Sequence, residues 1–557
     1  MSNMTNRVAA SILVLLFCST LAAVESTQHS EGDAITAHQW DVIDIHFAAS
    51  EVENPLNVTF AATFTHATGG SNRVTGFYNG GSDYIIRFTP PSSGTWNYVT
   101  VSPIAELSGL TGKLNVEPAG KGRRGGVVLD PENDRRFRYQ NGDGYYPIAF
   151  ECDWLFALDA ENQTDIPVTR TLVDQLADSG FNQVVMNVFA YDVTWDKDPN
   201  LPPAFEFGSP KAFPFAGSNK NPDHTTLNIE YFRRLDRVIE YLDRKGIVAH
   251  LMIYVWNKRA NWPKTDSDED NMYFDYVARR YQAFPNIVWD ISKEALGYGH
   301  NDVNYITGRI KRLRKQDAFN RLITVHDYGY CRRFSQQVDF VSVQLWQSEL
   351  YSVMRNVWET IPSKPILNIE HGGYECSPYT VFNGNYTSPE VCLQRAYLCV
   401  FAGTFPTHYW QGAAWNVVIP DINVLPEEDR PRLEYYRHMR DFVDRYDIGQ
   451  LAAGKNYSNA GFCLQNGRDL FIYYIPKECD FLGLRLKQFN GRSMKQTWFN
   501  PLTGEYSDHK TKKITRWPTV KVPDTENFHI LIVQIEDGVN HEGPSRSISP
   551  TCAGQAG

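Results

Sequence analysis

Two glutamates occupy matching places in the sequence, each at the end of an apolar stretch that is typical of a buried β-strand. Glu294 lies near the end of PNIVWDISKEALGYG, residues 285–299, and Glu370 lies in SKPILNIEHGGYE, residues 363–375. The pair Gly372-Gly373 leaves the backbone free to turn sharply after the second strand. Two carboxylic acids held across one site can cleave a glycosidic bond, because one protonates the departing oxygen while the other attacks the anomeric carbon.

These two residues are 76 positions apart, so the fold must bring them together. From about residue 127 to 445, strand-like and helix-like segments alternate. The helix PVTRTLVDQLADSG has Pro167 near its start and Gly180 just past its end, and the strand GFNQVVMNVF follows. The next helix, IEYFRRLDRVIEYLDRKG, carries apolar side chains at helical spacing and precedes the strand IVAHLMIYVW.

Eight strands are predicted in this region, at 145–154, 180–189, 247–256, 286–294, 322–328, 340–346, 365–370 and 405–410. Further helices are predicted near 270–283 and at 303–315, 389–399 and 431–445. Repeated βα units of this number predict a (β/α)8 TIM barrel over residues 127–445. A doubly wound open sheet is the alternative, and the lack of GxGxxG after the first strand argues against its nucleotide-binding form.

Alternation along each strand predicts which side chains face the barrel axis, because the outer face packs on apolar helices. The outward set of the fourth and seventh strands is Ile287, Trp289, Ile291, Leu367 and Ile369. The inward set is Val288, Asp290, Ser292, Glu294, Ile366, Asn368 and Glu370. The same alternation predicts that six further side chains face inward: Thr324, His326, Tyr328, Ser342, Gln344 and Trp346. Glu294 and Glu370 then meet at the C-terminal mouth, where barrel enzymes keep their chemistry.

Three segments resemble a known family: SSGTWNY (92–98), NIVWDISKEA (286–295) and KPILNIEHGG (364–373). The chain resembles the clan A glycoside hydrolases, and more closely the secreted bacterial apiosidase-like barrel group. Members of that group carry an N-terminal sandwich of unknown function and a C-terminal β domain with a collagen-binding designation. The resemblance implies that Glu294 is the acid/base and Glu370 the nucleophile of a retaining enzyme.

Lys293 departs from the clan A pattern, in which an asparagine that binds the sugar 2-hydroxyl precedes the acid/base. A cation at this position depresses the pKa of a nearby carboxylic acid. Contact with a different, acidic sugar substituent is the other interpretation. The substrate of this chain therefore cannot be inferred from clan A at large.

Further substrate contacts are predicted at the strand ends, beside the plainer interpretation that each residue is structural. Four tryptophans are candidates for stacking on sugar rings: Trp154, Trp256, Trp346 and Trp410. His326 and Tyr328 are candidates to orient Glu370 or to bind hydroxyl groups. The remaining candidate contacts are Asp153, Asn187, Tyr254 and His371. Glu375 is a rival nucleophile that lies beyond the strand.

Short β-rich runs flank the barrel on both sides. Residues 37–118 predict an immunoglobulin-like β-sandwich, joined to the barrel by the linker PAGKGRRGG at 118–126. Residues 447–540 predict a second sandwich, and residues 541–557 form a polar tail. A chain of 557 residues has room for these domains at roughly 150 residues each.

The first 23 residues follow the pattern of a cleaved signal peptide, so we expect a secreted or periplasmic protein. No other stretch approaches the length of a membrane span. Removing Cys18 leaves eight cysteines, and the hairpin-like FCLQNGRDLFIYYIPKEC makes a disulfide between Cys463 and Cys479 a candidate. A net charge of −10 without a long basic run disfavours nucleic-acid binding.

These observations predict a secreted retaining glycoside hydrolase that acts on a plant or algal polysaccharide or its side chains. Its partner is a carbohydrate substrate, and no metal or organic cofactor is expected. One alternative is a non-catalytic carbohydrate-binding or adhesion protein on a barrel scaffold. A lyase for uronic-acid polymers is a third, weaker hypothesis. The sugar, the linkage and the oligomeric state stay open.

Overall fold

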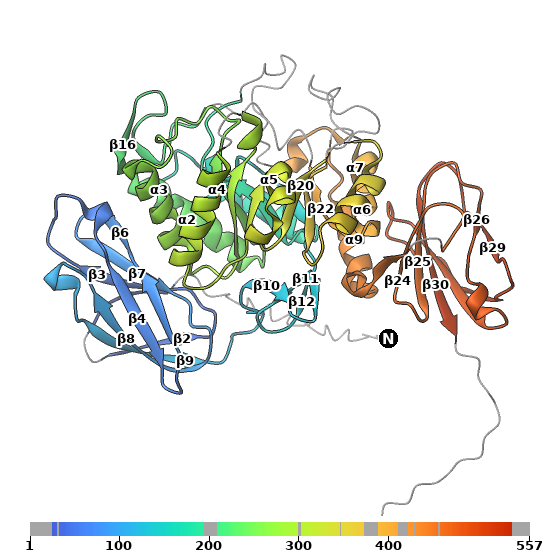
Figure 1. Ribbon diagram of the computed structural model, residues 1–557, viewed down its shortest axis with the longest axis horizontal. Helices are drawn as coiled ribbons and strands as arrows, with labels where there is room; N and C mark the ends of the chain where they lie inside the picture. Colours follow the sequence, from blue (N-terminus) through green and yellow to red (C-terminus); the bar gives the residue numbers. More distant parts are fainter. Residues whose placement is uncertain are drawn as a thin grey trace, which may run out of the picture.

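The computed structural model describes residues 25–30, 33–193, 209–298, 302–345, 347–371, 388–409, 421–427, 430–454 and 457–536. A central barrel carries one β domain on each side, as Figure 1 shows. The multidomain fold class predicted from the sequence is confirmed. None of the helices in the described ranges has the length and apolar character needed to cross a bilayer.

The N-terminal domain packs two sheets face to face. The first sheet runs in the order β1 (Glu25–Gln28), β3 (Ile43–Ala48), β7 (Asp83–Phe88) and β6 (Phe77–Gly80). The second runs β2 (Ala34–His38), β9 (Thr111–Glu117), β8 (Gly94–Val101), β4 (Ala61–His66) and β5 (Ser71–Thr75). Alternating apolar side chains fill the space between them, including Phe64 and Phe88, whose rings stack 3.8 Å apart.

Eight parallel strands form the barrel. In spatial order they are β19 (Ile323–His326), β18 (Ile287–Lys293), β17 (Val248–Val255), β14 (Gln183–Asn187), β13 (Ala149–Glu151), β22 (Phe405–His408), β21 (Ile366–Glu370) and β20 (Val341–Gln344). Side chains bridge the remaining junction, where Thr324 Oγ1 lies 2.9 Å from the Phe340 carbonyl and 3.1 Å from Ser342 Oγ. The sheet is therefore nearly closed, with β18 as the fourth strand and β21 as the seventh.

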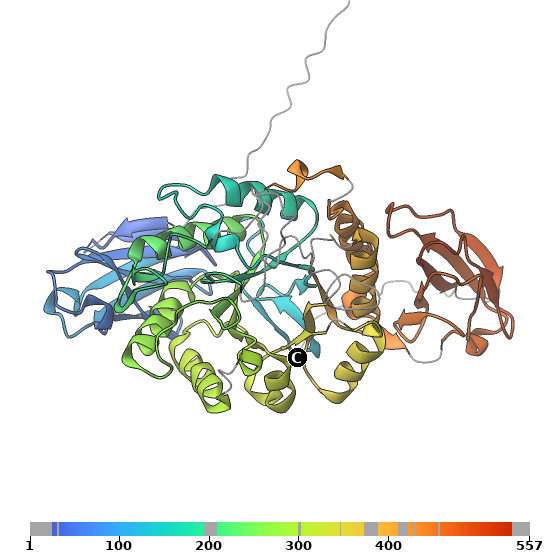
Figure 2. The same ribbon diagram turned by 90° about the horizontal axis from the view of Figure 1, so that it is seen from above.

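Helices surround these strands, as the view from above shows (Figure 2). They are α1 (Pro167–Asp178), α2 (Ile229–Arg244), α3 (Asp268–Tyr281), α4 (Val303–Gln316), α5 (Tyr328–Arg333), α6 (Leu350–Thr360), α7 (Pro389–Phe401) and α9 (Glu434–Arg445). Pro167 begins α1 and Gly180 follows it in the left-handed region, as predicted. The sequence interpretation missed α5 and α6.

Tyr328 was predicted on a strand, and the structure places it at the start of α5. The strand stops at His326 because the side chain of Asp327 accepts a hydrogen bond from the Tyr330 backbone N–H and caps the helix.

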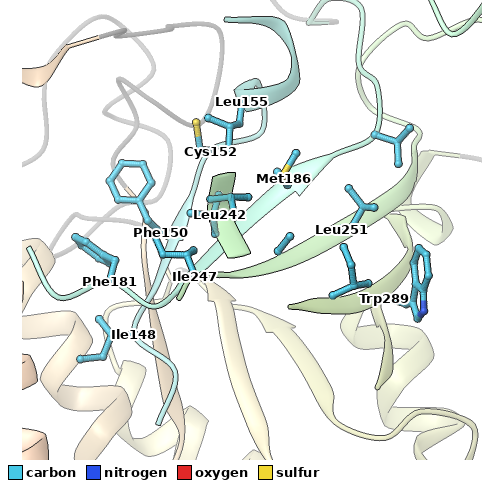
Figure 3. Close-up of a cluster of buried hydrophobic side chains, with 14 of the residues drawn as sticks. Ile148, Phe150, Cys152, Leu155, Phe181, Met186, Leu242, Ile247, Leu251 and Trp289 are labelled. Carbon is cyan, nitrogen blue, oxygen red and sulfur yellow. The ribbon is translucent and has the colours of Figure 1, made fainter. Parts of the chain in front are cut away.

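The outer face of the strands packs against the helices in rows. Met186, Leu251 and Trp289 lie in register on β14, β17 and β18, and Figure 3 shows them along these three neighbouring strands. All three belong to the large cluster that also includes the helix side chains Leu235 and Leu242. The outward direction predicted for Trp289 is therefore confirmed.

A small sheet closes the N-terminal end of the barrel. It consists of β10 (Val127–Asp130), β11 (Asn133–Tyr139) and β12 (Gly144–Tyr145), below the barrel in Figure 1. Phe137 on β11 packs on Phe340 and Phe405, which belong to the barrel. A hairpin of β15 (Phe215–Gly217) and β16 (Pro222–Leu227) lies in the segment between β14 and α2.

The C-terminal domain is a six-stranded sheet covered by a two-stranded ribbon. The sheet order is β23 (Ala452–Gly454), β24 (Phe462–Gln465), β25 (Leu470–Ile475), β30 (His529–Glu536), β27 (Ser493–Phe499) and β28 (Lys510–Lys513). The ribbon pairs β26 (Phe481–Gly483) with β29 (Thr519–Lys521). One sheet face joins the barrel core through Ile472 and Ile530, and the other packs on the ribbon through Phe471 and Leu531.

The predicted disulfide between Cys463 and Cys479 is not formed. The hairpin β24–β25 exists, but Cys463 pairs across it with Tyr473 and is buried. Cys479 lies beyond the end of β25, and both thiols are free. The hairpin pattern was correct, but β25 ends at Ile475, so the hairpin does not place Cys479 opposite Cys463.

Buried ion pairs join the N-terminal domain to the barrel. Arg87 on β7 binds Asp44 at 2.7 Å and Asp236 of α2 at 3.0 Å, while Arg280 of α3 binds Asp236 at 2.7 Å. The hydroxyl of Thr89 also donates a hydrogen bond to the Ala283 carbonyl. We refer to Arg87, Asp44, Asp236 and Arg280 as the interface network.

Candidate active site

Glu294 and Glu370 meet at the C-terminal mouth of the barrel. Glu370 is the last residue of β21, and Glu294 directly follows β18. An oxygen of Glu294, a ring nitrogen of His326 and an oxygen of Glu370 all lie within 4.8 Å of one another. The two acids singled out in the sequence therefore share one site with His326, which ends β19.

The inward direction of Glu370 depends on an irregularity that alternation does not predict. Asn368 pairs with Val343 and Glu370 pairs with Gln344, so β21 has one residue more than β20 at this step. A β-bulge of this kind shifts the alternation of the strand that contains it. Glu370 consequently points to the axis although Asn368 does not.

The predicted parity of the preceding part of β21 was wrong. Leu367 and Ile369 belong to the inner cluster with Val288. Ile366 belongs to the outer cluster, and the amide of Asn368 contacts the sulfur of Met354 on α6. Because of the bulge, Glu370 nevertheless faces the barrel axis.

A second bulge lies in β18. Asp290 pairs with Thr324 and Lys293 with His326, so β18 also has one extra residue against its neighbour. This shift turns Lys293 toward the other charged groups of the site. Glu294 then has a backbone φ of 54°, in the left-handed region that non-glycine residues seldom occupy. Its N–H donates to the His326 carbonyl at 2.9 Å.

Lys293 is buried in a cluster of carboxylates. Its Nζ lies 2.5 Å from Glu151 Oε1, 3.1 Å from Asp153 Oδ2 and 3.2 Å from Glu370 Oε2. A second ammonium, Lys258 Nζ, lies 3.8 Å from Asp153 Oδ2. We call Lys293, Lys258, Glu151, Asp153, Glu294 and Glu370 the mouth network.

Three neighbours hold the two candidate catalytic carboxylates. The side-chain amide of Gln344 donates to Glu370 Oε1 at 3.1 Å, and His326 Nε2 lies 3.5 Å from Glu370 Oε2. The amide of Asn257 donates to Glu294 Oε2. Glu370 is only 2% exposed, whereas Glu294 is partly exposed.

The charges of the mouth network shift its pKa values. Burial raises the pKa of Glu370 to about 7, Lys293 opposes this rise, and Glu294 adds to it. Burial would lower the pKa of Lys293, but Asp153, Glu151 and Glu370 hold it well above its usual value. Burial and the charge of Lys293 lower the pKa of His326 well below its usual value, so His326 is neutral.

Carboxylate oxygens and an imidazole nitrogen are also donors that bind divalent metals. Glu294, His326 and Glu370 offer such a set. The ammonium of Lys293, however, already lies against Glu370 and would repel a second cation. The donor set therefore fits an acid pair better than a metal centre.

Two of the predicted substrate contacts, Tyr254 and Trp154, are fully buried. The Tyr254 hydroxyl donates to Asp270 on α3, and its ring packs on Trp262. Trp154 is fully buried beside Phe156. Lys258 Nζ lies 5.7 Å from the ring centroid of Trp154, so this ring borders the mouth network, and both substrate contacts stay predictions.

Other predicted contacts keep a place near the mouth. Asn187 ends β14 and is fully buried, and within the described ranges its side-chain amide has no hydrogen-bond partner. Trp256 is partly exposed and stacks on Tyr254 at 5.5 Å. Tyr328 is also partly exposed. The carbonyl of His371, itself buried, accepts hydrogen bonds from Arg395.

Some predicted residues fall outside the described ranges, namely Trp346, Trp410 and Glu375. Sequence reasoning missed four members of the site: Glu151, Asn257, Lys258 and Gln344 as a direct partner of Glu370. The available signal was their position, since each is a polar residue within or just after the C-terminal end of a barrel strand.

Comparisons with known proteins show the family and the fold of this chain. The model of the apiosidase-like catalytic domain family matches residues 131–447, and a domain of unknown function, DUF5060, matches residues 36–103. No curated protein matches the chain.

Solved structures share the fold. A candidate glycoside hydrolase from Bacteroides vulgatus ATCC 8482 is 22% identical with a TM-score of 0.70, covering 90% of this chain and 100% of its own. A glycoside hydrolase family 5 protein from the same organism is 15% identical with a TM-score of 0.55, covering 74% of this chain and 94% of its own. The family match spans more than half of the sequence, so the chain belongs to the apiosidase-like family and is a glycoside hydrolase.

Proposed function

We propose that this glycoside hydrolase acts with retention of anomeric configuration, with Glu370 as nucleophile and Glu294 as acid/base. The observation that carries the proposal is the approach of the two carboxylates to within 4.8 Å. Retaining enzymes hold their carboxyl groups about 5–5.5 Å apart, whereas inverting enzymes leave roughly 6.5–9.5 Å for a water molecule.

The different surroundings of the two acids support these roles. Glu370 is buried against Lys293 and Gln344, which hold its carboxylate in one orientation. Glu294 is partly exposed, so a departing group and later a water molecule can reach it. A nucleophile needs fixed geometry, and an acid/base needs exchange of protons with solvent.

In the first step an oxygen of Glu370 attacks the anomeric carbon while Glu294 gives its proton to the glycosidic oxygen. The bond between the anomeric carbon and that oxygen breaks, and a glycosyl ester on Glu370 forms. Glu294, now ionised, removes a proton from water, whose oxygen attacks the anomeric carbon and releases Glu370.

Lys293 has a positioning role in this proposal. Its ammonium lies 3.2 Å from Glu370 and favours the ionised form that the attack requires. Glu151 and Asp153 hold the ammonium in place. Lys293 is buried among these three carboxylates. We therefore propose that its ammonium positions the Glu370 carboxylate and does not bind an acidic sugar substituent.

The substrate class proposed here is a plant or algal polysaccharide or its side chains, cleaved outside the cell. Its support is the family membership together with the signal-peptide pattern of residues 1–23. Mature protein in the culture medium or periplasm that begins after residue 22 or 23 would support export, and retention of the full N-terminus in the cytoplasm would reject it.

Two measurements test the mechanism. NMR of the first product released from a panel of pectic, hemicellulose and algal oligosaccharides should show the anomer of the substrate. A fluorinated glycoside that forms a slowly hydrolysed ester should label the peptide that contains Glu370. Formation of the opposite anomer would exclude retention, and a label on another residue would exclude Glu370 as nucleophile.

A further inference from the structure

The outer face of the ribbon β26–β29 carries an exposed aromatic side chain beside several cations. The antiparallel register Phe481↔Lys521 and Gly483↔Thr519 continues in the hydrogen bond from the Leu484 N–H to the Pro518 carbonyl. This register brings Arg485 opposite Trp517. Leu482, Val520 and Leu484 point into the domain core, so by alternation Arg485 and Trp517 point outward.

Within the described ranges, Trp517 is 59% exposed and Phe481, on the same ribbon, is 55% exposed. A large apolar ring left in water is an indication of a binding surface when polar groups surround it. Next along the ribbon, Thr519 is exposed, while the side chain of Asn459 covers Gly483 and accepts a hydrogen bond from its N–H. Figure 1 places β26 and β29 on the side of the domain that faces away from the barrel.

The surroundings of Trp517 are strongly basic. Residues 484–500 and 509–523 contain nine lysines and arginines and no acidic residue, whereas the whole chain has a net charge of −10. The two segments lie side by side, since the Gly491 N–H donates to the Ile514 carbonyl and the Ile514 N–H donates to the Arg492 carbonyl. We call Arg485, Lys487, Lys512, Arg516 and Trp517 the distal patch. Lys513 is left out because it pairs with Ser493 and points to the other face of the sheet.

The cations of the distal patch are available for a ligand. Lys512 is exposed on β28, and Arg485, Lys487 and Arg516 are exposed as well. Within the described ranges none of these four cations forms an ion pair with an acidic side chain. Phe481, at the other end of the ribbon, stands beside Asp480 and does not belong to the patch.

We propose that the distal patch binds an acidic polysaccharide, specifically a uronic-acid polymer, and so holds the enzyme on its substrate-bearing material. The ring of Trp517 offers a flat apolar face to a sugar ring. The guanidinium of Arg485 beside it matches the two oxygens of a carboxylate. The remaining cations attract a polyanion that the rest of this acidic chain would repel.

A second interpretation is that the lysines of β28 only protect the edge of the sheet, and it explains fewer features of the patch. β28 is the edge strand of the six-stranded sheet, and lysines on an edge strand prevent pairing with other chains. That role needs neither an exposed tryptophan nor cations on the neighbouring ribbon. The combination of Trp517 and Arg485 is therefore the part of the patch that the experiment must remove.

The test uses the full chain carrying Glu370→Gln, so that binding is measured without turnover and independently of the proposed mechanism. Polygalacturonate is the probe, and calorimetry or affinity electrophoresis is the measurement. We expect saturable binding that weakens at least about tenfold in 0.5 M NaCl, because salt screens exposed charges. Trp517→Ala and Arg485→Ala should each lower the affinity about tenfold, the effect of one lost charge-assisted or stacking contact.

Arg468→Ala is the matched control, since Arg468 is an exposed arginine in the β24–β25 turn, on the opposite half of the same sheet. It should bind like the parent. Equal binding by the Trp517 and Arg485 variants, or no binding by the parent, would overturn the proposal. Tighter binding to dextran sulfate, single-stranded DNA or collagen fibrils would also overturn it, because the partner would then belong to another class.

Discussion

Two buried charge networks in this molecule differ in their ratio of basic to acidic side chains. In the interface network two arginines, Arg87 and Arg280, match two aspartates, Asp44 and Asp236. In the mouth network two lysines face four carboxylates. The first network joins two domains, and the second lies where the chemistry is proposed.

The pKa values of the buried carboxylates follow this ratio of basic to acidic side chains. Burial opposes ionisation of Asp236, but Arg280 and Arg87 outweigh it and lower its pKa. At the mouth, burial outweighs the charges of Lys293 and Lys258 and raises the pKa of Glu370 to about 7. Glu240, an extra acid beside the interface network, shows the same effect, since burial and Asp236 raise its pKa to about 7. Burial therefore raises the pKa of a carboxylate here where neighbouring cations do not outweigh burial and the neighbouring acids.

The largest expected effect comes from removing the proposed nucleophile. Glu370→Gln should lower kcat by about 10⁴-fold or more, because the covalent step loses its attacking group. The melting temperature should change little, since the amide keeps the shape and the contact with Gln344. Steady-state kinetics on the best substrate and thermal denaturation measure the two effects. Residual activity above about one per cent would remove Glu370 from the nucleophile role.

The next effect comes from unbalancing the mouth network further. Lys293→Met should lower kcat about 10²-fold and move the acidic limb of the pH profile upward, because Glu370 loses the cation that keeps it ionised. Removing one partner of a buried cluster also costs about 3–5 kcal/mol of stability. Asp153→Asn should move the same limb downward, since Asp153 raises the pKa of Glu370. Shifts of the same sign in both variants would contradict this electrostatic account.

The wild-type pH profile distinguishes the two networks. The nucleophile must be ionised, so kcat/KM should fall about tenfold per pH unit as the pH drops below about 7. Asp236 has a lowered pKa, so its contribution to stability is present above its ordinary value of 3.8 and is lost as the pH falls below it. Activity should therefore be lost at pH values where thermal denaturation still shows an intact fold.

The smallest expected effect on catalysis comes from the interface network. Arg87→Met should cost about 3–5 kcal/mol of stability, because Asp44 and Asp236 lose a buried partner. It should leave kcat within about twofold at temperatures where the variant is folded. Urea denaturation and kinetics at low temperature provide the comparison. A large loss of kcat in the folded variant would show that the N-terminal domain shapes the mouth.

Local patterns were sufficient to predict much of the molecule. Pro167 and Gly180 delimit α1, and the periodic apolar residues of α2 lie against the barrel as expected. Glu294 and Glu370 were found because each ends an apolar strand, and the count of strands placed them on the fourth and seventh. The parity of β21 failed since alternation assumes a strand without bulges.

The sequence by itself determined the order of strands and helices, the strand that carries each acid, and the basic composition of the distal patch, because these follow from periodicity and residue type along the chain. Only the tertiary structure decided that Lys293 faces three carboxylates and that Glu370 turns inward. Both depend on how β18 and β21 slip against neighbouring strands. Register between strands is set by contacts far apart in the sequence, which no local pattern contains.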